Sequence, residues 1–178
     1  MVRLSHMNIS RSFVLPLLSA TVAAALASSA AATTSPADRD GTLLTWHGKE
    51  RTVQLPAGPE AIPGAPRSFR KFARQQLRKS WIQDLDHKPA CKKSPTMTVR
   101  SLRTDGFAIG GFGTYPQPGC ETGGGYAAYW AVRNGRWKLA FGTQEIPFCD
   151  ALEKFGFPSE LGIHKCYDGE DVVPYTHP

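Results

Sequence analysis

The alternation of apolar and polar positions is most regular on either side of Asn134-Gly135. An Asn-Gly pair between alternating apolar residues predicts a two-residue turn, because both central positions of that turn need a positive φ. We therefore expect a β-hairpin over residues 126–141. Residues that face one another across a hairpin point to the same side of the sheet. The expected pairs are all apolar and should face the core: Val132 with Trp137, Trp130 with Leu139, and Ala128 with Phe141. The other side of the hairpin is expected to be half exposed or lightly covered.

Helical spacing predicts one long helix that begins at Pro66 and is regular to about residue 80, with a bend, an extra contact or fraying after that. One of its faces is apolar, with Phe69, Phe72 and Leu77 in the same sector at about 100° per residue. The opposite face carries five basic residues, and residues 66–80 contain no acidic one. This face is a candidate binding surface for an anionic partner, although a solvated outer face has the same pattern. The five residues are Arg67, Arg70, Lys71, Arg74 and Arg78.

Shorter periodic segments complete the expected fold. Residues 42–46 and 51–55 predict two short strands, and residues 96–103 and 107–115 predict a second antiparallel pair. The register of that pair requires a bulge, most simply at Gly110-Gly111. Residues 149–155 predict a short helix that ends at Gly156. We expect a turn at residues 166–169 and a C-terminal segment that lies on the surface. The predicted fold class is α+β, with one main N-terminal helix packed on a curved antiparallel sheet, in one domain of residues 41–178.

Residues 1–32 have the layout of a secretory signal peptide. This segment contains Arg3 and Arg11 and no acidic residue. Residues 13–27 are mostly apolar, and small residues follow up to Ala32. A transmembrane anchor is the alternative, but the apolar run is short and contains Pro16. We expect cleavage near Thr33 and a disordered tail over residues 33–40. These features predict a secreted, extracellular protein.

Removing residues 1–32 lowers the formal charge from +6 on 178 residues to +4 on 146 residues, because two basic residues and no acidic one are lost. A chain of that length can form a single core. A mild positive charge outside the cell favours anionic polymers of the cell envelope or extracellular proteins as partners. Nucleic acid is not expected, because the charge is modest and no nucleic-acid-binding motif occurs. No cofactor is expected.

All four cysteines lie after the expected signal, and an even number in an exported chain predicts two disulfides. Three connectivities are open. We favour Cys91 with Cys120 and Cys149 with Cys166, which close loops around a hairpin and around a short helix. A zinc site would require paired CxxC or CxxH spacing, which the sequence lacks.

Candidates for catalysis are few. The sequence has no G-x-S-x-G motif, and its histidines after the signal are in predicted loops or near the end of the chain: His47, His87, His164 and His177. The disulfides could bring three carboxylates close to His164, where they could act as acid or base: Glu121, Glu145 and Asp150. Aromatic residues on strands or beside glycine-rich loops are alternative contacts for a partner: Trp46, Tyr115, Tyr126, Tyr129 and Tyr167. No catalytic residue is assigned.

The W-x-x-R-N-G-R-W hairpin of residues 130–137, after a predicted helix and together with four cysteines, resembles small secreted domains of unknown function from high-GC Gram-positive bacteria. The helix-then-sheet order of residues 66–166 is also similar to cystatin-like and NTF2-like α+β folds. This resemblance implies a curved sheet around a helix and no catalytic residue, and it does not fix a function.

The sequence therefore favours a secreted, non-catalytic binding domain. The alternative is a small extracellular hydrolase or isomerase with a pocket on the concave face of the sheet, and a third possibility is a structural component of the envelope. The enzyme alternative predicts a histidine or carboxylate that is buried in a cavity and has a shifted pKa.

Overall fold

The computed structural model describes residues 41–85, 92–114, 120 and 124–178, so the expected signal and the expected tail lie outside it. Two of its helices are α1 (Arg67–Leu85) and α2 (Cys149–Phe155). Short 3₁₀ turns, η1 (Pro59–Ala61) and η2 (Ser159–Leu161), precede α1 and follow α2. The strands are β1 (Leu43–Thr45), β2 (Arg51–Val53), β3 (Thr96–Arg103), β4 (Phe107–Thr114), β5 (Tyr126–Arg133), β6 (Arg136–Thr143), β7 (Lys165–Asp168) and β8 (Asp171–Pro174). The predicted α+β class, with one main helix, is confirmed.

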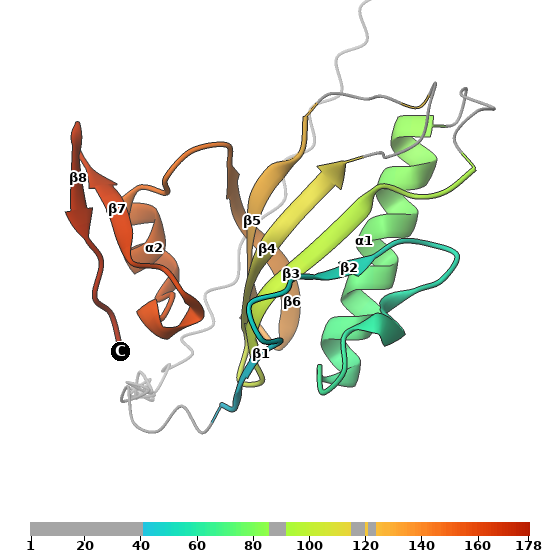
Figure 1. The fold of residues 1–178 in the computed structure, drawn as a ribbon, viewed down its shortest axis with the longest axis horizontal. Coiled ribbons are helices and arrows are strands. Elements are labelled where there is room, and N and C mark those ends of the chain that lie inside the picture. Colours follow the sequence, from blue (N-terminus) through green and yellow to red (C-terminus); the bar gives the residue numbers. More distant parts are fainter. Residues whose placement is uncertain (1–40, 86–91, 115–119, 121–123) are drawn as a thin grey trace, which may run out of the picture. The chain divides into compact units, whose positions relative to one another are not determined.

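The main sheet is antiparallel, in the order β1-β3-β4-β5-β6, and β2 also pairs with β3 (Figure 1). The two short N-terminal strands were expected from the sequence. Thr45 of β1 lies opposite Ser101, and Arg51 of β2 lies opposite Val99. The two strands are therefore pieces of one edge strand along β3, and residues 46–50 leave the sheet between them.

The β5–β6 hairpin has the predicted turn, with φ of 53° at Asn134 and 71° at Gly135. The pairs Val132 with Trp137 and Trp130 with Leu139 are confirmed. The expectation that all of these residues face the core is wrong for Leu139, which is 42% exposed. The expected pair of Ala128 with Phe141 is wrong, because Phe141 lies opposite Tyr129. Ala140 is the additional residue, and this bulge turns Phe141 to the opposite side of the sheet.

The β3–β4 pair contains the expected bulge, but on the other strand. Val99 faces Gly110 and Ser101 faces Ile109, so the additional residue is Arg100. At Gly110 a Cβ atom would lie 1.9 Å from the carbonyl oxygen of Thr98. Glycine is required at this position because the backbone of the bulged strand lies against it. This close approach explains why the Gly110-Gly111 pair indicated a bulge in this part of the sheet.

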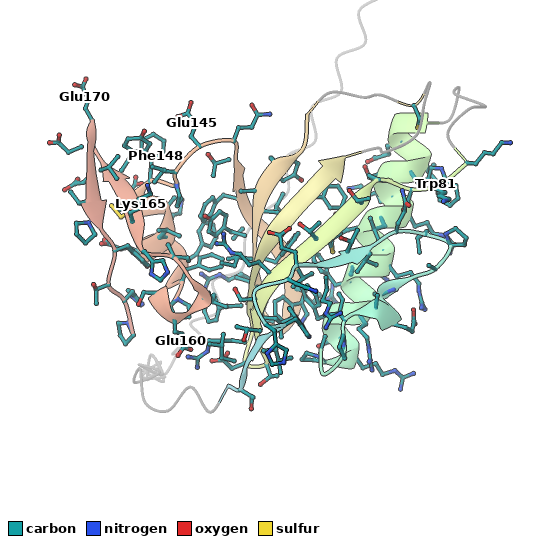
Figure 2. All side chains as sticks on the ribbon, viewed as in Figure 1. Trp81, Glu145, Phe148, Glu160, Lys165 and Glu170 are labelled. Atoms are coloured by element: carbon teal, nitrogen blue, oxygen red, sulfur yellow. A yellow bond between two sulfur atoms is a disulfide. The ribbon has the colours of Figure 1, made fainter. Side chains whose placement is uncertain are left out.

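The main sheet separates two hydrophobic cores. α1 covers one face, and the segment that contains α2, β7 and β8 covers the other (Figure 1). Side chains fill the space on both sides (Figure 2). The first core includes Phe69, Phe72, Ala73, Leu77, Met97, Val99, Leu102, Trp130 and Trp137. The second core includes Ile109, Tyr129, Ala131, Leu152, Phe157, Leu161, Ile163 and Tyr175. The second face of the hairpin is half exposed, as expected, because Ala127 and Lys138 are exposed. Residues far along the chain bury Tyr129 and Ala131 of the same face.

The predicted disulfide between Cys149 and Cys166 is present and joins the start of α2 to β7. Cys91 lies outside the described residues, so the pairing of Cys91 with Cys120 stays a prediction. Gly156 has φ of 64° and ends α2 as expected.

The last segment differs from the expectation. Most of the expected turn at residues 166–169 belongs to β7, and β8 pairs with it. Tyr175 is buried, and its hydroxyl donates a hydrogen bond of 2.7 Å to the carbonyl of Phe157. The end of the chain up to Tyr175 is thus part of the second core.

α1 begins directly after Pro66, whose carbonyl accepts a hydrogen bond of 3.1 Å from the amide of Arg70. It continues beyond residue 80, after which a bend, an extra contact or fraying was expected, and ends at Leu85. Among the described residues, no helix has the length and apolar character that crossing a membrane requires.

Candidate functional site: a basic groove along α1

The rotation of α1 about its axis is fixed by aromatic contacts with the sheet. The ring of Phe69 meets that of Trp137 edge to face, with 4.7 Å between centroids, and lies 6.2 Å from Trp130. Because this apolar stripe faces the sheet, the residues on the opposite side of α1 point to solvent. Rigid packing of one face therefore determines where the basic face lies.

All five basic residues that the helical spacing grouped together line one groove of about 640 Å³. We call it the basic groove. Its remaining lining residues are Glu60 and Gln75. The five basic residues are Arg67, Arg70, Lys71, Arg74 and Arg78.

One carboxylate contributes to the basic groove. Glu60, from η1, forms an ion pair with Arg74. A hydrogen bond from its own backbone and one from Arg74 lower the pKa of Glu60 below its ordinary value. Both partners are exposed, so the pair is screened by water and can open at little cost. Arg67, Arg70, Lys71 and Arg78 form no ion pair with another residue that the structure describes.

A second hollow, of about 480 Å³, lies between α1 and the tip of the β5–β6 hairpin. We call it the hairpin hollow. It shares Lys71 and Gln75 with the basic groove. Its other lining residues are Ser68, Phe72, Gly135, Arg136 and Trp137. Local sequence patterns do not indicate this hollow, because its two walls are far apart in the chain, with a separation of 69 residues between Ser68 and Trp137. The one local signal is the Asn-Gly turn beside Arg136.

The aromatic residues proposed as partner contacts have different environments. Trp46 is buried in the first core and Tyr129 in the second. Tyr126 lines a shallow hollow of about 340 Å³ over the part of the sheet near Thr98 and Gly111. The ring of Tyr167 lies 5.9 Å from that of Phe148, an exposed residue that precedes α2 (Figure 2). Tyr115 lies outside the described residues.

None of the candidate acids and bases that the structure describes is buried. His47, His164, Glu145 and Asp150 are exposed, and His177 is half buried. No histidine, aspartate or glutamate within residues 41–83, 92–113 and 124–178 is classed as buried, so this part of the chain offers no candidate for the buried acid or base that the enzyme alternative predicts. His87 and Glu121 lie outside the described residues. The described residues also contain no group of three histidines, cysteines or carboxylates that could hold a metal ion.

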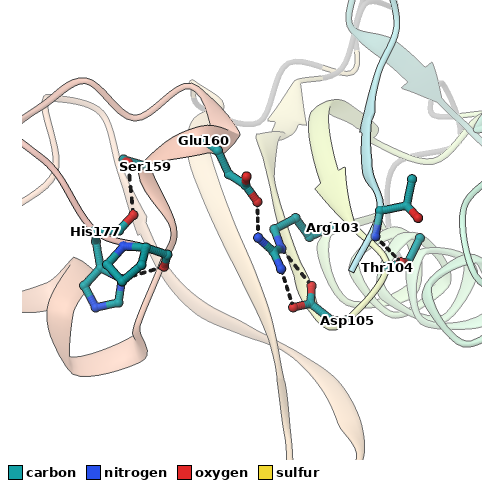
Figure 3. Close-up of polar contacts among 8 residues, drawn as sticks. Arg103, Thr104, Asp105, Ser159, Glu160 and His177 are labelled. Carbon is teal, nitrogen blue, oxygen red and sulfur yellow. Dashed lines mark hydrogen bonds and ion pairs between the residues drawn. The ribbon is translucent and has the colours of Figure 1, made fainter. Parts of the chain in front are cut away.

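A buried arginine lies away from the basic groove. The side chain of Arg103 is 8% exposed and binds both carboxylate oxygens of Asp105, at 3.0 and 2.9 Å (Figure 3). It also pairs with Glu160 of η2, on the opposite side of the guanidinium. Hydrogen bonds with Asp105 and Glu160 raise the pKa of Arg103 against the opposing effect of burial. This cluster joins the sheet to the segment that covers the second core.

The fold and the groove define an α+β domain with a strongly basic helix face. Comparisons with protein-family models, with curated proteins and with solved structures find no match for the chain.

Proposed function

We propose that this protein is a secreted, non-catalytic binding domain that holds an anionic polymer of the extracellular or cell-envelope space in the basic groove. The observation that carries the proposal is the set of five cationic side chains on one face of α1, lining one groove with a single carboxylate that is itself paired. Such a face attracts polyanions over a distance of about 10 Å at moderate ionic strength.

The arrangement of the cations suits an extended ligand. Arg67, Arg74 and Arg78 lie in a narrow sector of the helix, with Arg70 and Lys71 on either side. At a rise of 1.5 Å per residue, residues 67 and 78 are about 16 Å apart along the axis. A row of that length can contact several acidic groups of one polymer chain, whereas a small anion would contact one or two cations.

The proposed location outside the cell is supported by the signal-like residues 1–32 and by the disulfide between Cys149 and Cys166. Disulfides persist mainly in oxidising compartments. Four of the five cations are arginines, which present a planar fork to carboxylate, phosphate and sulfate groups.

The test is retention of the oxidised, exported protein on washed bacterial cell envelopes during a salt titration. Reversing three charges in the groove (Arg70→Glu, Arg74→Glu and Arg78→Glu) is expected to reduce retention at low salt by about tenfold or more, because each substitution replaces an attraction with a repulsion. The wild-type protein is expected to be released as salt is added.

The matched control reverses three exposed lysines outside the groove, Lys92→Glu, Lys138→Glu and Lys165→Glu, and so makes the same change in net charge. Its retention is expected to stay within about twofold of the wild type if location matters more than net charge. Equal retention of the groove variant and the wild type contradicts the proposal, as does an equal loss in both variants. Capture of one protein that remains bound at high salt also contradicts it, in favour of protein recognition.

A further inference from the structure

We infer that the polymer is an acidic polysaccharide, with its acid groups along the basic groove and one sugar ring in the hairpin hollow. This inference rests on the proposed function and adds the chemical class of the ligand. It names a second binding region, between α1 and the hairpin tip, that no helical periodicity indicates.

The two regions form one continuous surface. Lys71 and Gln75 line both the basic groove and the hairpin hollow. A ligand that lies along α1 can therefore enter the hollow without leaving the protein surface. Lys71 is placed to contact an acid group at the junction, and the amide of Gln75 can both donate and accept hydrogen bonds there.

The walls of the hairpin hollow differ from those of the groove. Phe72 and Trp137 each keep 7% of their surface exposed, and both line the hollow. Ser68 and Gln75 supply neutral polar groups beside them, and Lys71 and Arg136 supply positive charge. Aromatic surface with a few polar groups is typical of sites that bind small organic groups. A sugar ring has this combination of an apolar face and hydroxyl groups, whereas an inorganic polyanion has no carbon surface to place against the aromatic rings.

Contacts within the protein hold the walls of the hollow in place. The indole N–H of Trp137 donates a hydrogen bond of 3.2 Å to the hydroxyl of Ser68, and Phe69 packs against the same indole. Gly135 has a positive φ, and apart from its two chain neighbours no described residue has a heavy atom within 4 Å of the position that its Cβ would occupy. The hairpin tip therefore leaves open space at the rim, and little ordering is needed on binding.

The spacing of charges also fits a polysaccharide. Cations at successive turns of α1 recur about every 5.4 Å along the axis. Acid groups on successive rings of a polysaccharide recur at a comparable interval, whereas those of inorganic polyphosphate are closer together. Two kinds of acidic polysaccharide share this chemistry, those with uronic carboxylates and those with phosphodiester links between sugars.

The experiment compares the affinities of four probes for the exported protein. Oligogalacturonates supply carboxylates on sugars, and phosphomannan oligomers supply phosphates on sugars. Polyphosphate of equal charge supplies acid groups without sugars, and dextran oligomers supply sugars without acid groups. We expect one or both acidic sugars to bind about tenfold more tightly than polyphosphate, and dextran to bind weakly. The reason is that only an acidic sugar contacts both the basic groove and the hairpin hollow. The better of the two acidic sugars identifies the source of the acid.

Two variants of Ser68 test the role of the hollow. Ser68→Trp fills it from an exposed position of α1 and is expected to remove the tenfold preference for acidic sugars, without changing the affinity for polyphosphate. Ser68→Ala also loses the hydrogen bond to Trp137 but leaves the hollow open, so it is expected to keep the preference.

The possible results separate this inference from the proposed function. If polyphosphate binds as tightly as the acidic sugars, or if Ser68→Trp keeps the preference, the inference is wrong and the groove proposal remains. If the probes do not bind at all while the envelopes retain the protein, the inference is likewise wrong. If neither probes nor envelopes bind, both proposals fail.

Discussion

Tyr129 illustrates how a single residue connects the sheet to the second core. Its ring stacks on Phe141, with 4.3 Å between centroids, and meets Phe157 edge to face at 5.5 Å. Burial raises the pKa of the Tyr129 hydroxyl above the ordinary value of 10.0. The neutral phenol is therefore the form that the folded state favours, because the charged form would lose its hydration.

This raised pKa gives a prediction for alkaline stability. The contribution of Tyr129 is fully present below the pKa of an unfolded tyrosine, about 10, and is lost as the pH rises through the higher pKa of the folded state. Urea unfolding from about pH 8 to pH 11 should show the wild type losing stability relative to Tyr129→Phe above about pH 10, because phenylalanine does not ionise. Below about pH 9 the difference between the two proteins should be constant. A constant difference over the whole range would contradict this account.

At the scale of single elements, local patterns predicted what local physics determines. The Asn-Gly turn and the position of the five cations on α1 depend on neighbouring residues only, and the structure places them as expected. The bulge at Ala140 depends on residues that are distant in the chain. The alternation of apolar residues continues through Ala140, and only the packing of Phe141 against the second core selects the shifted register. The hairpin hollow could not be predicted for the same reason, since it joins Ser68 to a turn far along the chain.

The link between α2 and β7 makes a prediction at this scale. Cys149 and Cys166 close a loop with a sequence separation of 17 residues. Replacing both with serine (Cys149→Ser and Cys166→Ser) is expected to lower the free energy of unfolding by about 3 kcal/mol, mainly because the unfolded chain gains freedom. Chemical denaturation under oxidising conditions measures the change. A loss below about 1 kcal/mol would show that the packing of α2 and β7 on the sheet, and not the covalent link, determines their stability.

At the scale of the whole molecule, the sheet is stable only if both faces are covered. α1 covers one face through residues near Phe69, and the segment from α2 to Tyr175 covers Ile109 and Tyr129 on the other. The buried cluster of Arg103 with Asp105 and Glu160 adds polar contacts between the sheet and that segment. The C-terminal segment therefore belongs to the same folding unit as the sheet, although this segment follows the last strand of the sheet in sequence.

Removing this segment tests that conclusion. A chain that ends at Gln144 is expected to unfold without a cooperative transition and to bind a hydrophobic dye, because the second face of the sheet becomes exposed. A chain that ends at Thr176 keeps Tyr175 in the second core and is expected to unfold cooperatively. Thermal denaturation followed by circular dichroism distinguishes the two. A cooperative transition in the chain that ends at Gln144 would mean that α1 and the sheet fold alone.

The interrupted outer strands have a consequence for the protein in concentrated solution. Exposed sheet edges with unpaired backbone groups are templates on which another copy can add a strand, and this is a common route to aggregation. Along one edge, residues 46–50 divide the outer strand into two pieces of three residues, β1 and β2. Along the other, Ala140 interrupts the ladder of β6. Neither border offers a long, regular strand to a second molecule, so the interruptions themselves protect the sheet against edge-to-edge growth.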